Sequence, residues 1–225
     1  YDSVRKNVVL FGGRFNDETV SGETWLWDGL NWTLAADSGP GPRYHHAMAF
    51  DESRGKVVLF GGQGETDEGC CVVLSDTWEW DGTVWALVSE QFNAASQFPN
   101  MAYDADNQVI LMAAYQDTWA WNGTSWTEFT DENTPDLFDG AAMAYDKSRG
   151  SMVLVNNEGT WEWNGARWNR VSSTPVPTSL YGGTEHFSMT YDDAAGEMLL
   201  FGGREQKTMV LPILDTVGRP EERRP

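Results

Sequence analysis

The sequence predicts an all-β protein built from about five repeats of a four-stranded antiparallel unit, and two recurring segments are the basis for this. A tryptophan-rich segment occurs as TWLWDGLNW from Thr24, TWEWDGTVW from Thr77, TWAWNGTSW from Thr118 and TWEWNGARW from Thr160, and these copies hold all 12 tryptophans. A second segment, an aromatic residue and Asp followed by an apolar run, starts at Tyr1, Phe50, Tyr103, Tyr145 and Tyr191. Copies that begin 42 to 53 residues apart are typical of architectures that repeat one supersecondary unit.

The inner half of each unit is predicted to be a pair of strands. Four copies of the second segment follow alternating small and apolar residues, HHAMAF, PNMAY, GAAMAY and HFSMTY. A turn rich in Asp, Ser and Gly then leads into an uninterrupted apolar run such as Val57 to Phe60, which indicates a strand covered on both faces. The first copy lacks the alternating segment, so we expect its unit to have no innermost strand.

The outer half of each unit is predicted to be a tight hairpin. The dipeptides Asp28-Gly29, Asp81-Gly82, Asn122-Gly123 and Asn164-Gly165 tolerate positive φ and lie between β-forming residues. A two-residue turn at each dipeptide gives the cross-strand pairs Trp25 with Trp32, Trp78 with Trp85, Trp119 with Trp126, and Trp161 with Trp168. It also places Glu162 opposite Arg167 as an ion pair. Rings at one fixed place in every unit favour packing between successive units over sugar stacking.

These coupled elements resemble kelch repeats, the blades of a β-propeller, and most closely the bacterial kelch variety. PRYHHAMAFDESRGKVVLFGG followed by DTWEWDGTVW is similar to a nearly complete kelch unit. The resemblance covers residues 1–205 and implies a propeller of the galactose-oxidase-like superfamily, with residues 206–225 as a degenerate last-blade strand, expected within 208–215, and a C-terminal tail. Two alternatives stay open: five blades with incomplete ends, or part of a larger ring of six or seven.

The diglycine that follows the second strand of a kelch unit is only partly kept. Gly12-Gly13, Gly61-Gly62 and Gly202-Gly203 match it, whereas Ala113-Ala114 and Asn156-Asn157 replace it. We therefore expect these two units to turn differently after their second strand.

The charge and apolar content of the sequence limit the classes of partner that we expect. A net charge of -19 repels phosphate backbones and anionic headgroups, so nucleic acid is not an expected partner. The sequence has no run of 18 or more apolar residues and no basic-then-apolar N-terminus, so we expect neither membrane insertion nor an export signal within this chain. Cys70 and Cys71 are adjacent and cannot staple a fold. Adjacent cysteines can form a strained eight-membered disulfide ring, but we expect two loop thiols or intermolecular disulfides.

The resemblance also implies a binding face, formed by the loops after the second strands and by the connections between units. These loops are long at about Arg14 to Glu23 and Gln63 to Ser75, so the face should be walled by units one and two. The residues expected on this face are Arg14, Asn16, Asp17, Arg43, Tyr44, His46, Glu65, Asp67, Glu68, Gln97, Tyr115, Glu185 and Arg204.

The sequence offers two candidate metal sites on the same loop face. One site would coordinate a divalent metal through His45, His46, His186 and Glu185. The alternative is that these imidazoles form hydrogen bonds with the backbone. Glu65, Asp67 and Glu68 offer oxygen ligands for calcium, against the alternative of a solvated acidic loop.

The leading functional hypothesis is a noncatalytic binding module for a protein or glycan, in an exported bacterial protein that is secreted, periplasmic or at the cell surface. It follows from the abundance of scaffold residues beside the lack of a catalytic constellation. Neither the copper site of galactose-oxidase-like enzymes nor the iron site of kelch nitrile-specifier proteins can be matched residue by residue. The alternatives are a metal-dependent enzyme and an architectural subunit of a cell-surface assembly, with neighbouring domains of a larger chain as partners.

Overall fold

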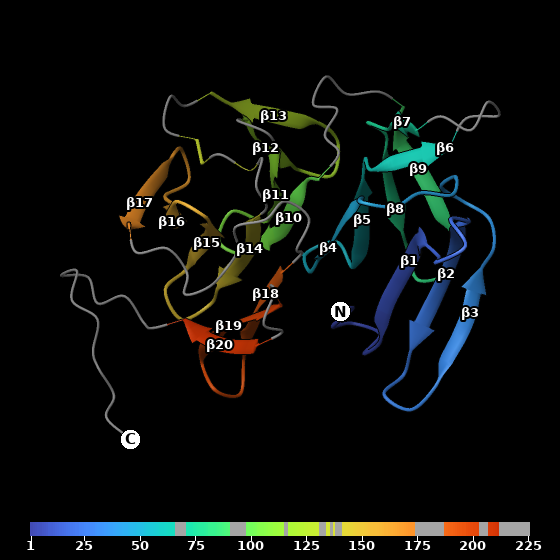
Figure 1. The fold of residues 1–225 in the computed structure, drawn as a ribbon, viewed down its shortest axis with the longest axis horizontal. Helices are drawn as coiled ribbons and strands as arrows, with labels where there is room; N and C mark the ends of the chain where they lie inside the picture. The colour runs from blue at the N-terminus through green and yellow to red at the C-terminus, as the bar shows by residue number, and fades with distance from the viewer. Residues whose placement is uncertain are drawn as a thin grey trace. The chain divides into compact units, whose positions relative to one another are not determined.

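The computed structural model is all-β over the residues that it describes, which are 1–65, 71–90, 98–114, 117–130, 134–135, 137, 141–173, 187–202 and 207–211. These residues form five sheets of three or four strands, which we call blades 1 to 5 in chain order, and one two-stranded sheet in a loop of blade 2 (Figure 1). The pairs of neighbouring strands in blades 1, 2, 4 and 5 are antiparallel.

The strand bounds follow the predicted repeat. Blade 1 has β1 (Val8–Arg14), β2 (Val20–Trp27) and β3 (Trp32–Ala36). Blade 2 has β4 (Ala47–Asp51), β5 (Lys56–Phe60), β8 (Thr77–Trp80) and β9 (Trp85–Ser89), with β6 (Gln63–Glu65) and β7 (Cys71–Val73) in its loop. Blade 3 has β10 (Asn100–Asp104), β11 (Val109–Ala114), β12 (Asp117–Trp121) and β13 (Trp126–Phe129). Blade 4 has β14 (Ala141–Asp146), β15 (Ser151–Asn156), β16 (Gly159–Trp163) and β17 (Trp168–Ser172), and blade 5 has β18 (Phe187–Asp192), β19 (Glu197–Gly202) and β20 (Lys207–Leu211).

The first and last blades each have three described strands. Blade 1 consists of β1, β2 and β3, and β20 of blade 5 lies mostly within residues 208–215. No helix in the described part of the chain is long and apolar enough to cross a membrane.

The chain divides into two compact units. The first comprises residues 1–103, 108–114 and 120–126, and the second comprises the remainder. In the first unit, Val58, Ile110 and Trp121 form a buried cluster that joins residues of blades 2 and 3. In the second unit, Val153 and Val155 of blade 4 pack with Met198 and Leu200 of blade 5. The core therefore lies between the faces of successive sheets, where burial of apolar area stabilises the fold.

A repeated hydrogen bond accompanies this packing. In blades 2, 3 and 4, the third tryptophan of the hairpin donates its indole N–H to the threonine that begins the hairpin of the preceding blade. The three bonds are Trp85 to Thr24 at 2.8 Å, Trp126 to Thr77 at 2.9 Å and Trp168 to Thr118 at 2.8 Å. Packing of these tryptophans between successive units, as predicted, is confirmed.

The predicted turn of the hairpins is one residue too early, so the predicted cross-strand partners are off by two residues. The structure pairs Trp27 with Trp32 and Trp25 with Leu34, because the turn is Gly29-Leu30 and not Asp28-Gly29. Asp28 holds this turn, since its Oδ1 accepts the N–H groups of Leu30 and Asn31, both at 2.7 Å.

The same correction applies to the hairpin of blade 4. Trp163 lies opposite Trp168, and Glu162 lies opposite Asn169, so the predicted pair of Glu162 with Arg167 does not form. Glu162 is instead paired with Arg149.

A second repeated device closes the turn between the inner strands. The Asp that precedes this turn in blades 1, 2 and 4 accepts backbone N–H groups of the turn and binds an Arg three residues later. Asp2 binds Arg5 at 2.7 Å, and Asp51 binds Arg54 at 2.7 Å. In blade 4, Asp146 binds Arg149 at 2.8 Å.

Candidate functional site

The candidate site lies in the first unit, where the ends of β1 and β5 meet the segment that precedes β4. The Gly13 N–H donates to the Arg43 carbonyl at 2.9 Å. Tyr44 and Gln63 exchange two backbone hydrogen bonds, at 3.0 and 2.8 Å. The loop sides of blades 1 and 2 are therefore joined where the sequence predicted a binding face.

The diglycines make this junction possible. Gly12 and Gly62 have φ of 63° and 92°, in the left-handed region that side chains disfavour. A Cβ at Gly12 would lie 2.6 Å from the Arg43 carbonyl oxygen, and a Cβ at Gly62 would lie 2.7 Å from that of Tyr44. Any larger residue would push the segment before β4 away from both blades.

Four side chains form a continuous row at the junction, which we call the Arg14–Phe98 row: Arg14, Tyr44, His45 and Phe98. The Arg14 guanidinium lies 5.4 Å from the centre of the Tyr44 ring. The His45 ring is 4.7 Å from that of Tyr44 and 4.6 Å from that of Phe98. Tyr44 is buried, whereas Arg14, His45 and Phe98 are exposed. The row thus offers solvent a cation beside two aromatic rings, which can stack on apolar or planar groups and donate hydrogen bonds.

His45 is held in an unusual backbone conformation. Its φ is 56°, which is uncommon for a residue with a side chain. This conformation accompanies the contacts of its ring with both aromatic neighbours in the row. Non-glycine residues with positive φ cluster at functional sites more often than elsewhere.

Arg43, expected on the binding face, lies in the interior. It is 2% exposed and makes a bidentate pair with Asp76, at 2.6 and 2.9 Å. Its Nη1 also donates to the Gly61 carbonyl at 3.1 Å. Burial raises the pKa of Asp76, but its bonds to Arg43 and Trp78 outweigh burial and lower the pKa overall. Arg43 therefore holds the diglycine turn in place.

His46 is also turned inward. Its ring packs edge-on against Phe11, with the ring centres 5.5 Å apart. Burial lowers its pKa to about 4, helped by the positive charge of Arg43 and by His45, so the imidazole is neutral at pH 7.

The other predicted site residues are placed only in part. Asn16 and Asp17 are exposed in the loop after β1, and Glu65 is exposed at the end of β6. Hydrogen bonds from the Thr19 hydroxyl and backbone lower the pKa of Asp17. The residues that lie outside the described part of the chain are Asp67, Glu68, Gln97, Tyr115, Glu185, His186 and Arg204.

The predicted metal sites include several of these residues. Within the described ranges, no group of three or more His, Cys, Asp or Glu side chains is arranged to hold a metal ion. His45 and His46 are described, but their expected partners Glu185 and His186 are not, so the divalent metal site stays a prediction. The calcium site stays one too.

Phe98 was missed by the sequence analysis, although the repeat contains the signal for it. Alignment of NMAYD at Asn100 with AMAFD at Ala47 puts Phe98 at the position of His45. The predicted face instead named the preceding residue, Gln97.

Comparison with known proteins supports the fold. No family model and no curated protein matches the chain. Among solved structures, YjhT is 11% identical with a TM-score of 0.64, covering 91% of this chain and 76% of that one. The fucose-specific lectin from Aleuria aurantia is 10% identical with a TM-score of 0.50, covering 92% of this chain and 73% of that one. The β-propeller domain of the trilobed protease from Pyrococcus furiosus is 10% identical with a TM-score of 0.49, covering 93% and 62%.

At these identities the likeness shows the fold alone. The chain is an all-β protein with a propeller-like fold, and its described blades are sheets of three or four strands.

Proposed function

We propose that the chain is a kelch-type, noncatalytic binding module that holds a glycan or protein partner on the loop side of blades 1 and 2. The observation that carries this proposal is the Arg14–Phe98 row. An exposed cation and two exposed rings, arranged around the buried Tyr44 ring and supported by the pair of Arg43 and Asp76, are a preorganised surface of the kind on which partners anchor.

A glycan is the first ligand class to test. Aromatic rings stack on the C–H faces of sugars, and guanidinium groups bond to sugar hydroxyls and carboxylates. The lectin of similar fold is fucose-specific, which makes fucosylated glycans a sensible part of the test set. A secreted, periplasmic or cell-surface location fits this class of ligand.

The experiment compares Phe98→Ala and Arg14→Ala with the unmodified chain on glycan and peptide arrays, followed by calorimetry on each hit. Phe201→Ala is the matched control, because Phe201 is 56% exposed against 47% for Phe98 and lies on β19 of blade 5. We expect Phe98→Ala to weaken binding by about tenfold or more, as the truncation of an aromatic anchor does.

The control variant should bind like the unmodified chain. Hits whose affinities do not change in Phe98→Ala and Arg14→Ala would contradict the proposed surface. Failure of the unmodified chain to bind any glycan or peptide would contradict the proposed function.

A further inference from the structure

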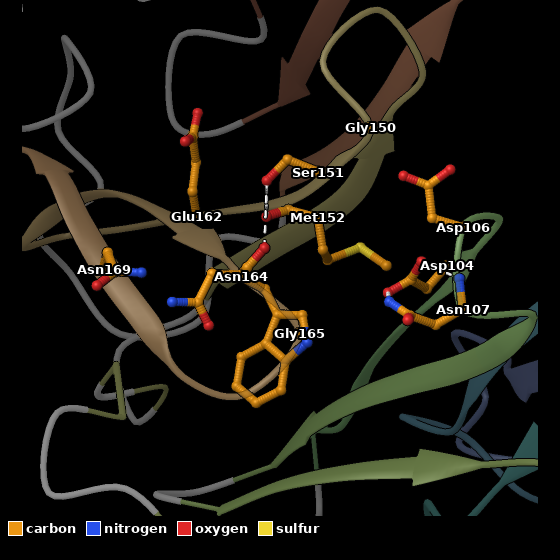
Figure 2. Close-up of a pocket in the computed structure, with 11 residues that line it drawn as sticks. Asp104, Asp106, Asn107, Gly150, Ser151, Met152, Glu162, Asn164, Gly165 and Asn169 are labelled. Atoms are coloured by element: carbon orange, nitrogen blue, oxygen red, sulfur yellow. Dashed lines mark hydrogen bonds between the residues drawn. The ribbon is translucent and has the colours of Figure 1, made fainter. Parts of the chain in front are cut away.

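A pocket of about 420 Å³ lies in the second unit, at the opposite end of its blades from the loops after the second strands. The turn between β10 and β11 contributes Asp104, Asp106 and Asn107 to one wall. The hairpin between β16 and β17 contributes Asn164 and Gly165 to the other (Figure 2). The pocket therefore lies between an inner turn and the outer hairpin of the blade that follows it.

In the first unit, the equivalent space is filled by a guanidinium group. Arg54, from the inner turn of blade 2, lies so close to the outer hairpin of blade 3 that a Cβ at Gly123 would be 2.8 Å from its Cζ. Arg5, from the inner turn of blade 1, approaches Gly82 of blade 2 in the same way and donates to the Asp81 carbonyl. An arginine thus closes each of these two spaces.

Blade 3 lacks this arginine. The repeat reads YDSVR, FDESR and YDKSR in blades 1, 2 and 4, but YDADN in blade 3, so Asn107 takes the position of Arg5 and Arg54. A Cβ at Gly165 would meet nothing within 4 Å, in contrast to Gly82 and Gly123. The pocket is the space that the missing side chain would fill, and we call it the Asn107 pocket.

The pocket keeps the negative charge that the arginine neutralises elsewhere. Asp104 is 3% exposed, and its two oxygens accept the backbone N–H of Asn107 at 3.1 Å and its side-chain amide at 2.9 Å, both neutral groups. Asp106 adds a second carboxylate, which accepts a bond from the Tyr145 hydroxyl; burial and this bond raise the pKa of Tyr145 to about 12. The residues that line the pocket include no Lys, Arg or His. A buried carboxylate without a cation is costly, so the chemistry of the walls favours a cationic guest.

Trp163 is a further polar side chain on the wall of the pocket. In blade 3, the equivalent Trp121 donates its N–H at 3.1 Å to Glu79, the acceptor that also binds Arg54. Trp163 is 5% exposed and lines the pocket, and none of the described residues accepts its N–H. The equivalent Trp80 of blade 2 also has no acceptor among the described residues although Arg5 fills the space beside Gly82, so the open N–H of Trp163 adds a donor to the pocket wall and does not itself indicate a cationic guest.

The same indole argues against a sugar as the guest. Its ring is packed against Trp168 and Phe129, with ring centres 5.4 and 5.2 Å away, so it has little free face for stacking. A peptide arginine supplies the missing guanidinium, and its main-chain carbonyl can accept a hydrogen bond from the open indole N–H. We propose that the Asn107 pocket binds an arginine side chain of a protein or peptide partner.

The test is a titration of the full chain with N-acetyl-arginine methylamide, followed by NMR and calorimetry. The matched ligand is the citrulline analogue, which has nearly the same shape but no charge. The lysine analogue and calcium are the other two probes. We expect saturable binding of the arginine ligand at millimolar concentration, and at least tenfold weaker binding of citrulline.

Variants then locate the site. Asn107→Arg should fill the pocket, abolish binding and raise the unfolding temperature by about 2 to 4 °C. Asn107→Gln, which adds length without charge, should keep most of the binding, and Asp106→Asn should weaken it about threefold or more. Equal binding of arginine and citrulline, preference for calcium or no binding at all would overturn the proposal. So would unchanged binding in a folded Asn107→Arg variant, and the ligand comparison decides even where a variant fails to fold.

Discussion

At the scale of single residues, His46 shows how the junction of blades 1 and 2 depends on charge. Its Nδ1 is buried and has no hydrogen-bond partner among the described residues, and its ring lies against Gly12 and Phe11. Protonation would place a second positive charge beside Arg43 in a buried site. The fold therefore requires a neutral imidazole here.

This requirement predicts a pH dependence of stability. The unfolded chain takes up a proton at His46 below pH 6.5, whereas the folded chain does so only below a pKa of about 4. Stability should therefore be constant above pH 6.5 with respect to this group and fall as the pH drops from 6.5 to 4, by on the order of 3 kcal/mol. Urea unfolding at a series of pH values measures it.

A histidine-to-glutamine pair provides the control. His46→Gln should flatten the dependence between pH 6.5 and 4, whereas His45→Gln, which removes only the smallest of the three causes that lower the pKa of His46, should keep most of it. An equal slope in the unmodified chain and in His46→Gln would show that His46 is not the titrating group.

At the scale of elements, the hairpin carries the interface between blades. Its third tryptophan is 1% exposed at Trp168 and partly buried at Trp85 and Trp126, whereas Trp32 of blade 1 is 47% exposed. The same residue type at the same repeat position thus has two environments. This contrast makes a matched experiment possible.

We predict that Trp168→Phe destabilises the chain by about 2 kcal/mol, because it loses the bond to Thr118 and part of the buried ring. Trp32→Phe should change the free energy of unfolding by less than about 0.5 kcal/mol. Denaturant unfolding of both variants checks this. Equal effects at the two positions would contradict a special role for the buried indole.

The hairpin also shows what could be predicted from the sequence and what could not. The alternation of Trp25 and Trp27 fixes which face they share, and that prediction is confirmed. The register was wrong because Asp28-Gly29 fits two turns, one with Asp28 inside the loop and one with Asp28 as the first residue that caps it. The hydrogen bonds of its carboxylate decide for the second, and a dipeptide signal alone does not contain them.

At the scale of the whole molecule, the sequence was enough for the class of fold but not for the sites. Periodicity predicts sheets of three and four strands, since each unit repeats the same local pattern. The Asn107 pocket was missed because it depends on a turn and on a hairpin of the next blade, which only three dimensions bring together. Its signal was nevertheless present, as an asparagine in place of the arginine of YDxxR.

The inward position of Arg43 was missed for the opposite reason. It occurs in a loop-rich segment with the composition of a binding face, and only its contacts with Asp76 and Gly61 reveal a structural role. A charged residue in a predicted loop can contact a ligand or form a buried ion pair, and the sequence alone does not distinguish the two.

The account depends on the indoles lying between successive blades and not forming an open surface on which ligands stack. Hydrogen exchange of the indole N–H groups, followed by NMR and assigned with single Trp→Phe variants, tests it most directly. The indoles of Trp85, Trp126 and Trp168, each bonded to a threonine of the preceding blade, should exchange slowly, and that of Trp32 should exchange within the dead time. Fast exchange at all four positions would contradict the account.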